Sequence, residues 1–128
     1  MFSYKLRCPR QKCRGCFYVC GQEMINLCMI KEMFKKKADY YCNIMGVTYG
    51  RISIRNQKTR WGSCSSLGNL NFNYRLFFMP DELMDYVIVH ELCHRIHMNH
   101  SKQFWKEVEK YYPEYRKAQN VLRKYCGN

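Results

Sequence analysis

Residues 89–94 read Val-His-Glu-Leu-Cys-His, and a further histidine, His100, follows six positions later. Residues four positions apart lie on the same face of a helix, so the rings of His90 and His94 can converge on one metal ion. Glu91 stands one position round from His90, where its carboxylate can reach a water bound to that ion. This combination of residue types and spacing is typical of zinc hydrolases.

The number of histidines decides which kind of zinc site the sequence can build. Catalytic zinc has three protein ligands and a water, whereas structural zinc has four protein ligands. On a straight helix, His97 would lie about 10 Å along the axis from His90, too far for one ion with metal–nitrogen distances of about 2 Å. A turn at residues 98–99 would let His100 reach the ion instead. We therefore expect His90, His94 and His100 as the metal ligands, with His97 beside them as a rival ligand or a transition-state partner.

The motif lies in a predicted helix at residues 81–97, whose N-terminus Asp81 can cap. Residues 87–89, Val-Ile-Val, place apolar side chains on several faces of this helix, so we expect it to be buried. Buried polar side chains are costly unless they have partners, and metal ligation would give the two histidines theirs. Cys93, inside the motif, is predicted to be a small core residue on the side away from the metal.

Hydrophobic periodicity predicts the other elements. We expect helices at residues 22–45, 101–112 and 113–126 and strands at residues 51–55 and 69–78. Gly46 is well placed to end the first helix, Ser101 is well placed to cap the second, and a turn at residues 65–68 can join the two strands as a hairpin. The predicted fold class is α+β: a small antiparallel β-sheet or hairpin, packed with the motif helix and two C-terminal helices and preceded by an N-terminal helix.

The composition of the 128 residues fits one globular domain, with 47% hydrophobic residues for a packed core. No run approaches the roughly 18 apolar residues that a membrane-spanning helix needs, and no secretory signal is visible. We therefore expect a cytoplasmic protein whose nine cysteines are mostly free thiols. The net charge of +12 indicates either nucleic-acid association through the basic surface or simply a soluble basic surface. We see no arginine–aromatic array that would specify nucleic-acid readout.

The N-terminal segment is basic and rich in cysteine. Its four cysteines, spaced C-x4-C-x2-C-x3-C, are Cys8, Cys13, Cys16 and Cys20. Cysteines this close can bind zinc or an iron–sulfur cluster, although this spacing matches no standard pattern; the alternative is an arm that binds no metal. We therefore divide the chain into a cysteine-rich basic N-terminal arm at residues 1–21 and a single domain at residues 22–128.

Four segments together resemble a known family: WGSCS at residues 61–65, NLNFNYRL at 69–76, VIVHELCH at 87–94 and NHSKQFW at 99–105. In this order and spacing they are similar to the YgjP-like predicted metal-dependent hydrolases, relatives of the SprT-like and WLM zinc proteases. The resemblance extends over about two-thirds of the chain. It implies a zincin-like fold with one zinc ion held by three histidines and with the helix glutamate acting as the base.

Carried over to this chain, the resemblance implies His90, His94 and His100 as zinc ligands and Glu91 as the catalytic base of a zinc-dependent metallopeptidase. Its partners would be peptide or protein substrates. Family members usually carry a longer, β-rich N-terminal half, which residues 1–21 do not resemble. A zinc-stabilised, nucleic-acid-associated binding module and a catalytically inactive remnant are the alternatives.

The predicted reaction assigns the proton transfers to Glu91 and leaves open which residue stabilises the oxyanion. Zinc would lower the pKa of its water to about 7, and Glu91 would take the proton and deliver it to the leaving amine. A donor for the developing oxyanion is also needed. The candidates for it are Arg60, Tyr74, Arg75 and His97. The strand at residues 69–76 is expected to present its edge to an extended peptide.

Overall fold

The computed structural model describes residues 16–19, 23–57 and 59–125, and these form an α+β fold, as predicted. The strands are β1 (Cys16–Val19), β2 (Glu23–Asn26), β3 (Ile52–Arg55), β4 (Gly62–Cys64) and β5 (Leu70–Asn73), and the helices are α1 (Leu27–Met45), the 3-10 helix η1 (Tyr74–Phe78), α2 (Asp81–Cys93), α3 (Lys102–Tyr111) and α4 (Tyr115–Tyr125). Within the described ranges, no helix is both long and apolar enough to cross a bilayer.

The three-stranded sheet has the order β3-β5-β4 and is mixed, so the prediction of an antiparallel sheet is wrong in part. Strand β3 runs parallel to β5, with Ile52 opposite Leu70, whereas β4 runs antiparallel to β5. The turn at residues 65–68 therefore joins β4 to β5, and not β3 to β5. Gly68 adopts a φ of 89° in this turn, which favours glycine. The sequence Gly-Ser-Cys of β4 is too short and too polar to show a strand pattern, which explains why this strand was not predicted.

Helix α1 begins at Leu27, later than predicted, because residues 23–26 pair with β1 as strand β2. Ile30, Phe34 and Ala38 recur every four residues on the face that is fully buried. Phe34 stacks on Phe72 of β5, with ring centroids 4.8 Å apart, and so attaches α1 to the sheet.

Strand β5 ends at Asn73, so the second half of the predicted strand at residues 69–78 is wrong. The Asn73 side chain accepts a hydrogen bond from the backbone N–H of Arg75 and donates to the carbonyls of Gln57 and Arg60. This capping turns the chain into η1, where Leu76 and Phe77 enter the core. The alternating pattern continues past residue 73, but one side chain diverts the backbone.

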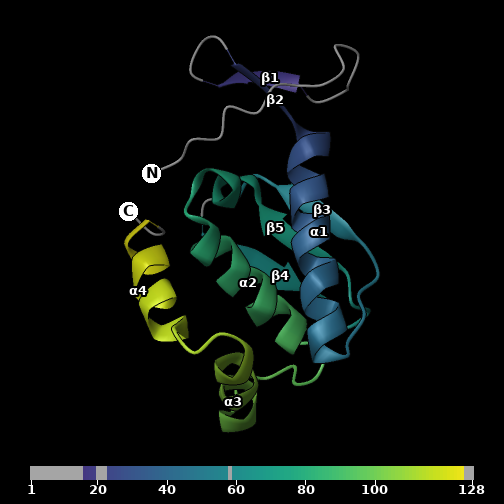
Figure 1. The fold of residues 1–128 in the computed structure, drawn as a ribbon, viewed down its shortest axis with the longest axis vertical. Coiled ribbons are helices and arrows are strands. Elements are labelled where there is room, and N and C mark those ends of the chain that lie inside the picture. Colours follow the sequence, from purple (N-terminus) through teal and green to yellow (C-terminus); the bar gives the residue numbers. More distant parts are fainter. Residues whose placement is uncertain (1–15, 20–22, 58, 126–128) are drawn as a thin grey trace.

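Helix α2 is the centre of the domain and contacts α1, β4, α3 and α4 (Figure 1). It is buried over most of its length, as predicted. Asp81 is its first residue and not its cap, because Pro80 occupies the N-cap position. The helix ends at Cys93, earlier than the predicted His97, since the backbone N–H groups of residues 94–96 bond to carbonyls three positions back in a tight turn. Cys93 is fully buried, in agreement with its predicted core position.

The C-terminal helices surround one end of α2. The hydroxyl of Ser101 accepts a hydrogen bond from the backbone N–H of Phe104, which confirms the predicted cap of α3. Helix α4 begins at Tyr115 and not at the predicted Pro113, which lies in the connecting turn. Of the N-terminal cysteines, Cys8, Cys13 and Cys20 lie outside the described residues, so the predicted metal site there and the boundary at residue 21 stay predictions.

Candidate active site

Three histidine rings come together at the C-terminal end of α2. One ring nitrogen from each of His90, His94 and His100 lies within 4.8 Å of the other two. The Nε2 atoms of His90 and His100 are 3.3 Å apart. Two nitrogens bound at about 2.05 Å to one tetrahedral ion would be separated by about 3.3 Å, so this pair fits zinc. Three imidazoles leave the fourth position of a tetrahedral ion for water or substrate, which is the catalytic arrangement.

Each of the first two rings is oriented by a hydrogen bond through its other nitrogen. His94 Nδ1 lies 3.1 Å from the backbone carbonyl oxygen of His97, so Nδ1–H donates and Nε2 keeps its lone pair. His90 Nδ1 lies 3.3 Å from the hydroxyl of Tyr86, one turn earlier on α2. Such contacts fix the tautomer and the direction of a metal ligand.

An aromatic floor supports the rings. The fully buried Phe104 packs against all three histidines, with centroid distances of 5.0 Å to His90, 4.5 Å to His94 and 4.9 Å to His100. His100 is exposed and stacks on Trp105 at 5.7 Å. Because Ser101 caps α3, the first turn of that helix places both aromatic rings beside the histidines.

Burial keeps two of the histidines neutral. Burial, together with smaller effects of the neighbouring His94 and His100, lowers the pKa of His90 to about 3. Burial also lowers the pKa of His94. Neutral imidazoles are the form that binds metal, so these rings have their lone pairs available at neutral pH.

Glu91 is next to His90 on α2 and only 6% exposed. Burial raises the pKa of its carboxyl to about 8, while the positive charge of Arg60 acts in the opposite direction. A cation on the neighbouring histidines would also favour the carboxylate. Strand β4 passes close above Glu91: a Cβ atom added at Gly62 would lie 3.2 Å from Glu91 Cγ. Glycine at this position therefore leaves room for the carboxylate beside the strand.

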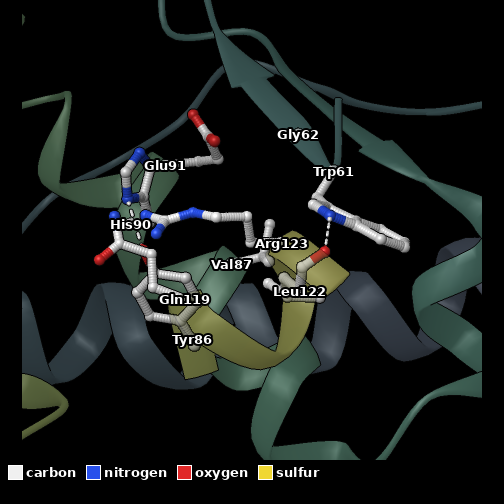
Figure 2. Close-up of a pocket in the computed structure, with 9 residues that line it drawn as sticks. All are labelled: Trp61, Gly62, Tyr86, Val87, His90, Glu91, Gln119, Leu122 and Arg123. Carbon is white, nitrogen blue, oxygen red and sulfur yellow. Dashed lines mark hydrogen bonds between the residues drawn. The ribbon is translucent and has the colours of Figure 1, made fainter. Parts of the chain in front are cut away.

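Two cavities meet at Gly62, His90 and Glu91 and together form a cleft. The first, of about 330 Å³, lies over the three histidines and is bordered by Arg60 and by residues 63–64 of β4. The second, of about 310 Å³, lies between Trp61 and α4 (Figure 2). Strand β4 is one of the two edge strands of the sheet, and its residue Gly62 lines both cavities.

The sequence profile described as "YgjP-like, metallopeptidase domain" matches residues 28–125. The chain belongs to this YgjP-like family. The YgjP-like domain thus includes every helix that contributes to the cleft, and the predicted family is confirmed.

Solved structures support the same fold for this YgjP-like domain. It is similar to the crystal structure of the metallopeptidase zymogen of Pyrococcus abyssi abylysin, with 26% sequence identity, a TM-score of 0.65, and coverage of 72% of this chain and 93% of that one. It is also similar in fold to the metallopeptidase zymogen of Methanocaldococcus jannaschii jannalysin, with 23% identity, a TM-score of 0.61, and coverage of 71% and 95%. No curated protein matches the sequence.

The remaining predicted candidates lie in different places in the YgjP-like domain. Arg60 borders the cavity over the histidines. His97 faces the site through its carbonyl oxygen, which bonds to His94. Tyr74 packs edge-on against Phe78 and lines a separate cavity. Arg75 places its guanidinium 4.9 Å from the ring centroid of Trp61 and does not line either cavity of the cleft.

Sequence reasoning missed three residues of the cleft: Tyr86, Gln119 and Arg123. The position of Tyr86, four residues before His90 on the same helix, was a signal that could have identified it. Gln119 and Arg123 have no such local signal, because only the packing of α4 against α2 brings them to the cleft.

Proposed function

We propose that this YgjP-like domain is a zinc-dependent peptidase in which His90, His94 and His100 hold the metal and Glu91 is the general base. The observation that carries the proposal is the convergence of three imidazoles, two of them held by hydrogen bonds through their other nitrogens, beside a buried carboxylate at the floor of an open cleft. Bound zinc would supply a Lewis acid and would lower the pKa of a water in the cleft.

Glu91 moves the protons in the proposed reaction. Its carboxylate accepts a proton from the attacking water and later gives that proton to the leaving amine. Its burial suits both roles, because a raised proton affinity makes the carboxylate a better base at neutral pH, and the neutral acid it becomes is not destabilised by desolvation. Arg60, at the border of the same cavity, is our candidate for the group that faces the developing oxyanion.

The substrate is proposed to lie along β4. We expected the strand at residues 69–76 to offer its edge, but β5 is the central strand and has neighbours on both sides. Strands β3 and β4 are the two edge strands, and β4 is the one that passes directly beside Glu91. An extended peptide that adds to this edge would be held by main-chain hydrogen bonds, with its side chains pointing alternately into and away from the cleft.

Nucleic-acid association through the basic surface remains a second, separate prediction that rests on the net charge of +12. Part of the lysine-rich stretch of α1 is neutralised, because Lys35 pairs with Asp39 and Lys37 pairs with Asp85. Retention on DNA that falls steeply with salt would support the prediction, and no retention at physiological salt would remove it.

The test of the peptidase compares wild type with Glu91→Gln. Both should bind one zinc ion per chain, measured by metal analysis after dialysis, and only wild type should cleave an unfolded protein substrate. A wild-type protein that takes up no zinc would refute the metal site. A protein that binds zinc and cleaves no substrate would indicate the inactive remnant, and equal cleavage by Glu91→Gln would remove Glu91 as the base.

A further inference from the structure

The cleft carries an arginine on each side of the histidines. Arg60 borders the cavity over the three rings, and Arg123 borders the cavity beside α4. Both side chains are exposed. Within the part of the chain that the structure describes, neither guanidinium forms an ion pair with a carboxylate. Arginine stays charged at all ordinary pH values, so both positive charges are available to a ligand.

The cleft contains almost no negative charge to balance these arginines. Among the described residues that line the two cavities, Glu91 is the only acidic one. It lies where the cavities meet and is 6% exposed, so it belongs to the reaction centre and not to the rim. A peptide that approaches along β4 therefore meets positive charge on both sides of the reaction centre.

Contacts of the last turn of helix α4 hold the backbone at Arg123 in place. The preceding residue, Leu122, is buried, and its carbonyl oxygen accepts a hydrogen bond of 3.3 Å from Trp61 Nε1. The guanidinium of Arg75 covers the Trp61 ring and also reaches the carbonyl of Tyr125 at 3.5 Å, so the last turn of α4 is clamped to the sheet side of the cleft. Figure 2 shows the Arg123 side chain extending from this clamped turn toward the His90 ring.

Gln119 lies one turn before Arg123 on the same face of α4 and lines the same cavity. A guanidinium offers paired donors that match the two oxygens of a carboxylate, and a neighbouring amide can donate a further hydrogen bond to it. Trp61, Val87 and Leu122 add largely apolar side chains to the lining of this cavity. The cavity of about 310 Å³ therefore combines an apolar lining with the cation of Arg123, and this combination suits the aliphatic stem and charged end of an acidic side chain.

We propose, on the basis of the proposed peptidase function, that this cleft selects acidic peptides, and that Arg123 is the specificity-determining residue that binds a glutamate or aspartate side chain next to the scissile bond. Arg60 adds to the selection on the other side of the histidines. Arg123 acts on the choice of substrate, while Glu91 and the histidines act on the reaction.

The first test measures cleavage. A set of peptides carries Glu, Gln or Lys at one position, and this position is moved along the peptide on both sides of the cleaved bond. When the varied residue is the one that contacts Arg123, kcat/KM should be at least about tenfold higher for the Glu peptide than for the Gln peptide, and lowest for the Lys peptide. The difference should arise chiefly from KM, and tenfold corresponds to about 1.4 kcal/mol. Arg123→Gln should remove the preference for Glu over Gln, Arg123→Lys should keep part of it, and Arg123→Glu should favour Lys.

The matched control is Arg51→Gln, which removes the same charge from an exposed position immediately before β3, the strand farthest from β4 in the sheet. It should leave the preference unchanged. Equal cleavage of the Glu, Gln and Lys peptides at every position would overturn the proposal, as would an unchanged preference in Arg123→Gln.

A second measurement does not depend on turnover. The zinc-loaded Glu91→Gln protein is titrated with the same peptides carrying a fluorophore, and binding is followed by anisotropy. The Glu peptide should bind at least about tenfold more tightly than the Gln peptide, and Arg123→Gln in this background should remove the difference. Equal or undetectable binding of the three peptides would overturn the selectivity, whereas absence of wild-type cleavage together with selective binding would refute the peptidase alone.

Discussion

The burial of Glu91 gives the metal-free protein a stability that depends on pH in a predictable direction. Burial raises the pKa of this carboxyl from 4.5 to about 8, so the folded state binds a proton that the unfolded state releases. The contribution of Glu91 to the free energy of unfolding should therefore be complete below pH 4.5. It should decrease as the pH rises above 4.5 and be lost once the pH has risen through 8. The limiting slope for one proton is about 1.4 kcal/mol per pH unit.

His90 acts in the opposite direction over a different range. Its pKa falls from 6.5 to about 3 in the folded state, so its contribution to stability is complete above pH 6.5 and is lost as the pH falls. Between pH 6.5 and 8 the Glu91 contribution is therefore separate from that of His90. Over this window, the release of this proton on unfolding lowers the free energy of unfolding by about 1.6 kcal/mol.

The assay is urea unfolding followed by far-UV circular dichroism, at several values between pH 6.5 and 8 and with a metal chelator present. Wild type should become less stable over this range, and Glu91→Gln should lack this component, because glutamine does not titrate. Zinc should reduce the slope in wild type, since a cation next to Glu91 favours its ionised form. Parallel pH profiles for metal-free wild type and Glu91→Gln would refute the argument that burial holds the proton on Glu91.

Three further substitutions test how the cleft is built. Gly62→Ala should lower the free energy of unfolding, measured with urea, by about 1–3 kcal/mol through overpacking, because the added Cβ would lie 3.1 Å from both the Asn71 carbonyl oxygen and Val87 Cγ1. A stability equal to that of wild type would contradict this. Tyr86→Phe removes the hydroxyl beside His90 and should weaken zinc binding by about 10–100-fold in competition with a chelator, while the exposed Tyr125→Phe should not. Trp61→Phe should cost about 1 kcal/mol through the lost hydrogen bond to α4, and an undiminished stability would show that this bond does not hold the helix.

Local sequence patterns predicted the motif helix and the convergence of His90, His94 and His100. The spacing of the first two histidines depends only on helix geometry, and a break before His100 was required by metal–nitrogen distances. The structure places that break immediately after Cys93. There the backbone N–H groups of residues 94–96 bond to carbonyls three residues back, in place of the α-helical bonds to carbonyls four residues back. Periodicity continues into this turn, so it could not reveal where the helix stops.

Non-local packing decided the features that the sequence did not reveal. Strand β4 has three residues and little hydrophobic character, and it becomes a strand only because β5 pairs with it. The same pairing makes β4, and not β5, the edge beside Glu91. Arg123 comes from the last helix, far along the chain from the motif, and its role depends on the clamp between Trp61 and Leu122. No spacing rule connects residues that are brought together in this way.

The bond from His94 to residue 97 has a consequence for how this site tolerates sequence change. The acceptor is a main-chain oxygen, so exchanging the imidazole at position 97 for another side chain leaves it in place. The orientation of the His94 ring therefore depends on the backbone conformation of residues 94–97. Hydrogen bonds from the backbone N–H groups of residues 95, 96 and 97 to carbonyls at the end of α2 fix that conformation. Related proteins can therefore vary freely at position 97 and keep the ring's orientation, whereas an inserted or deleted residue in this turn would rotate the ring away from its two partners.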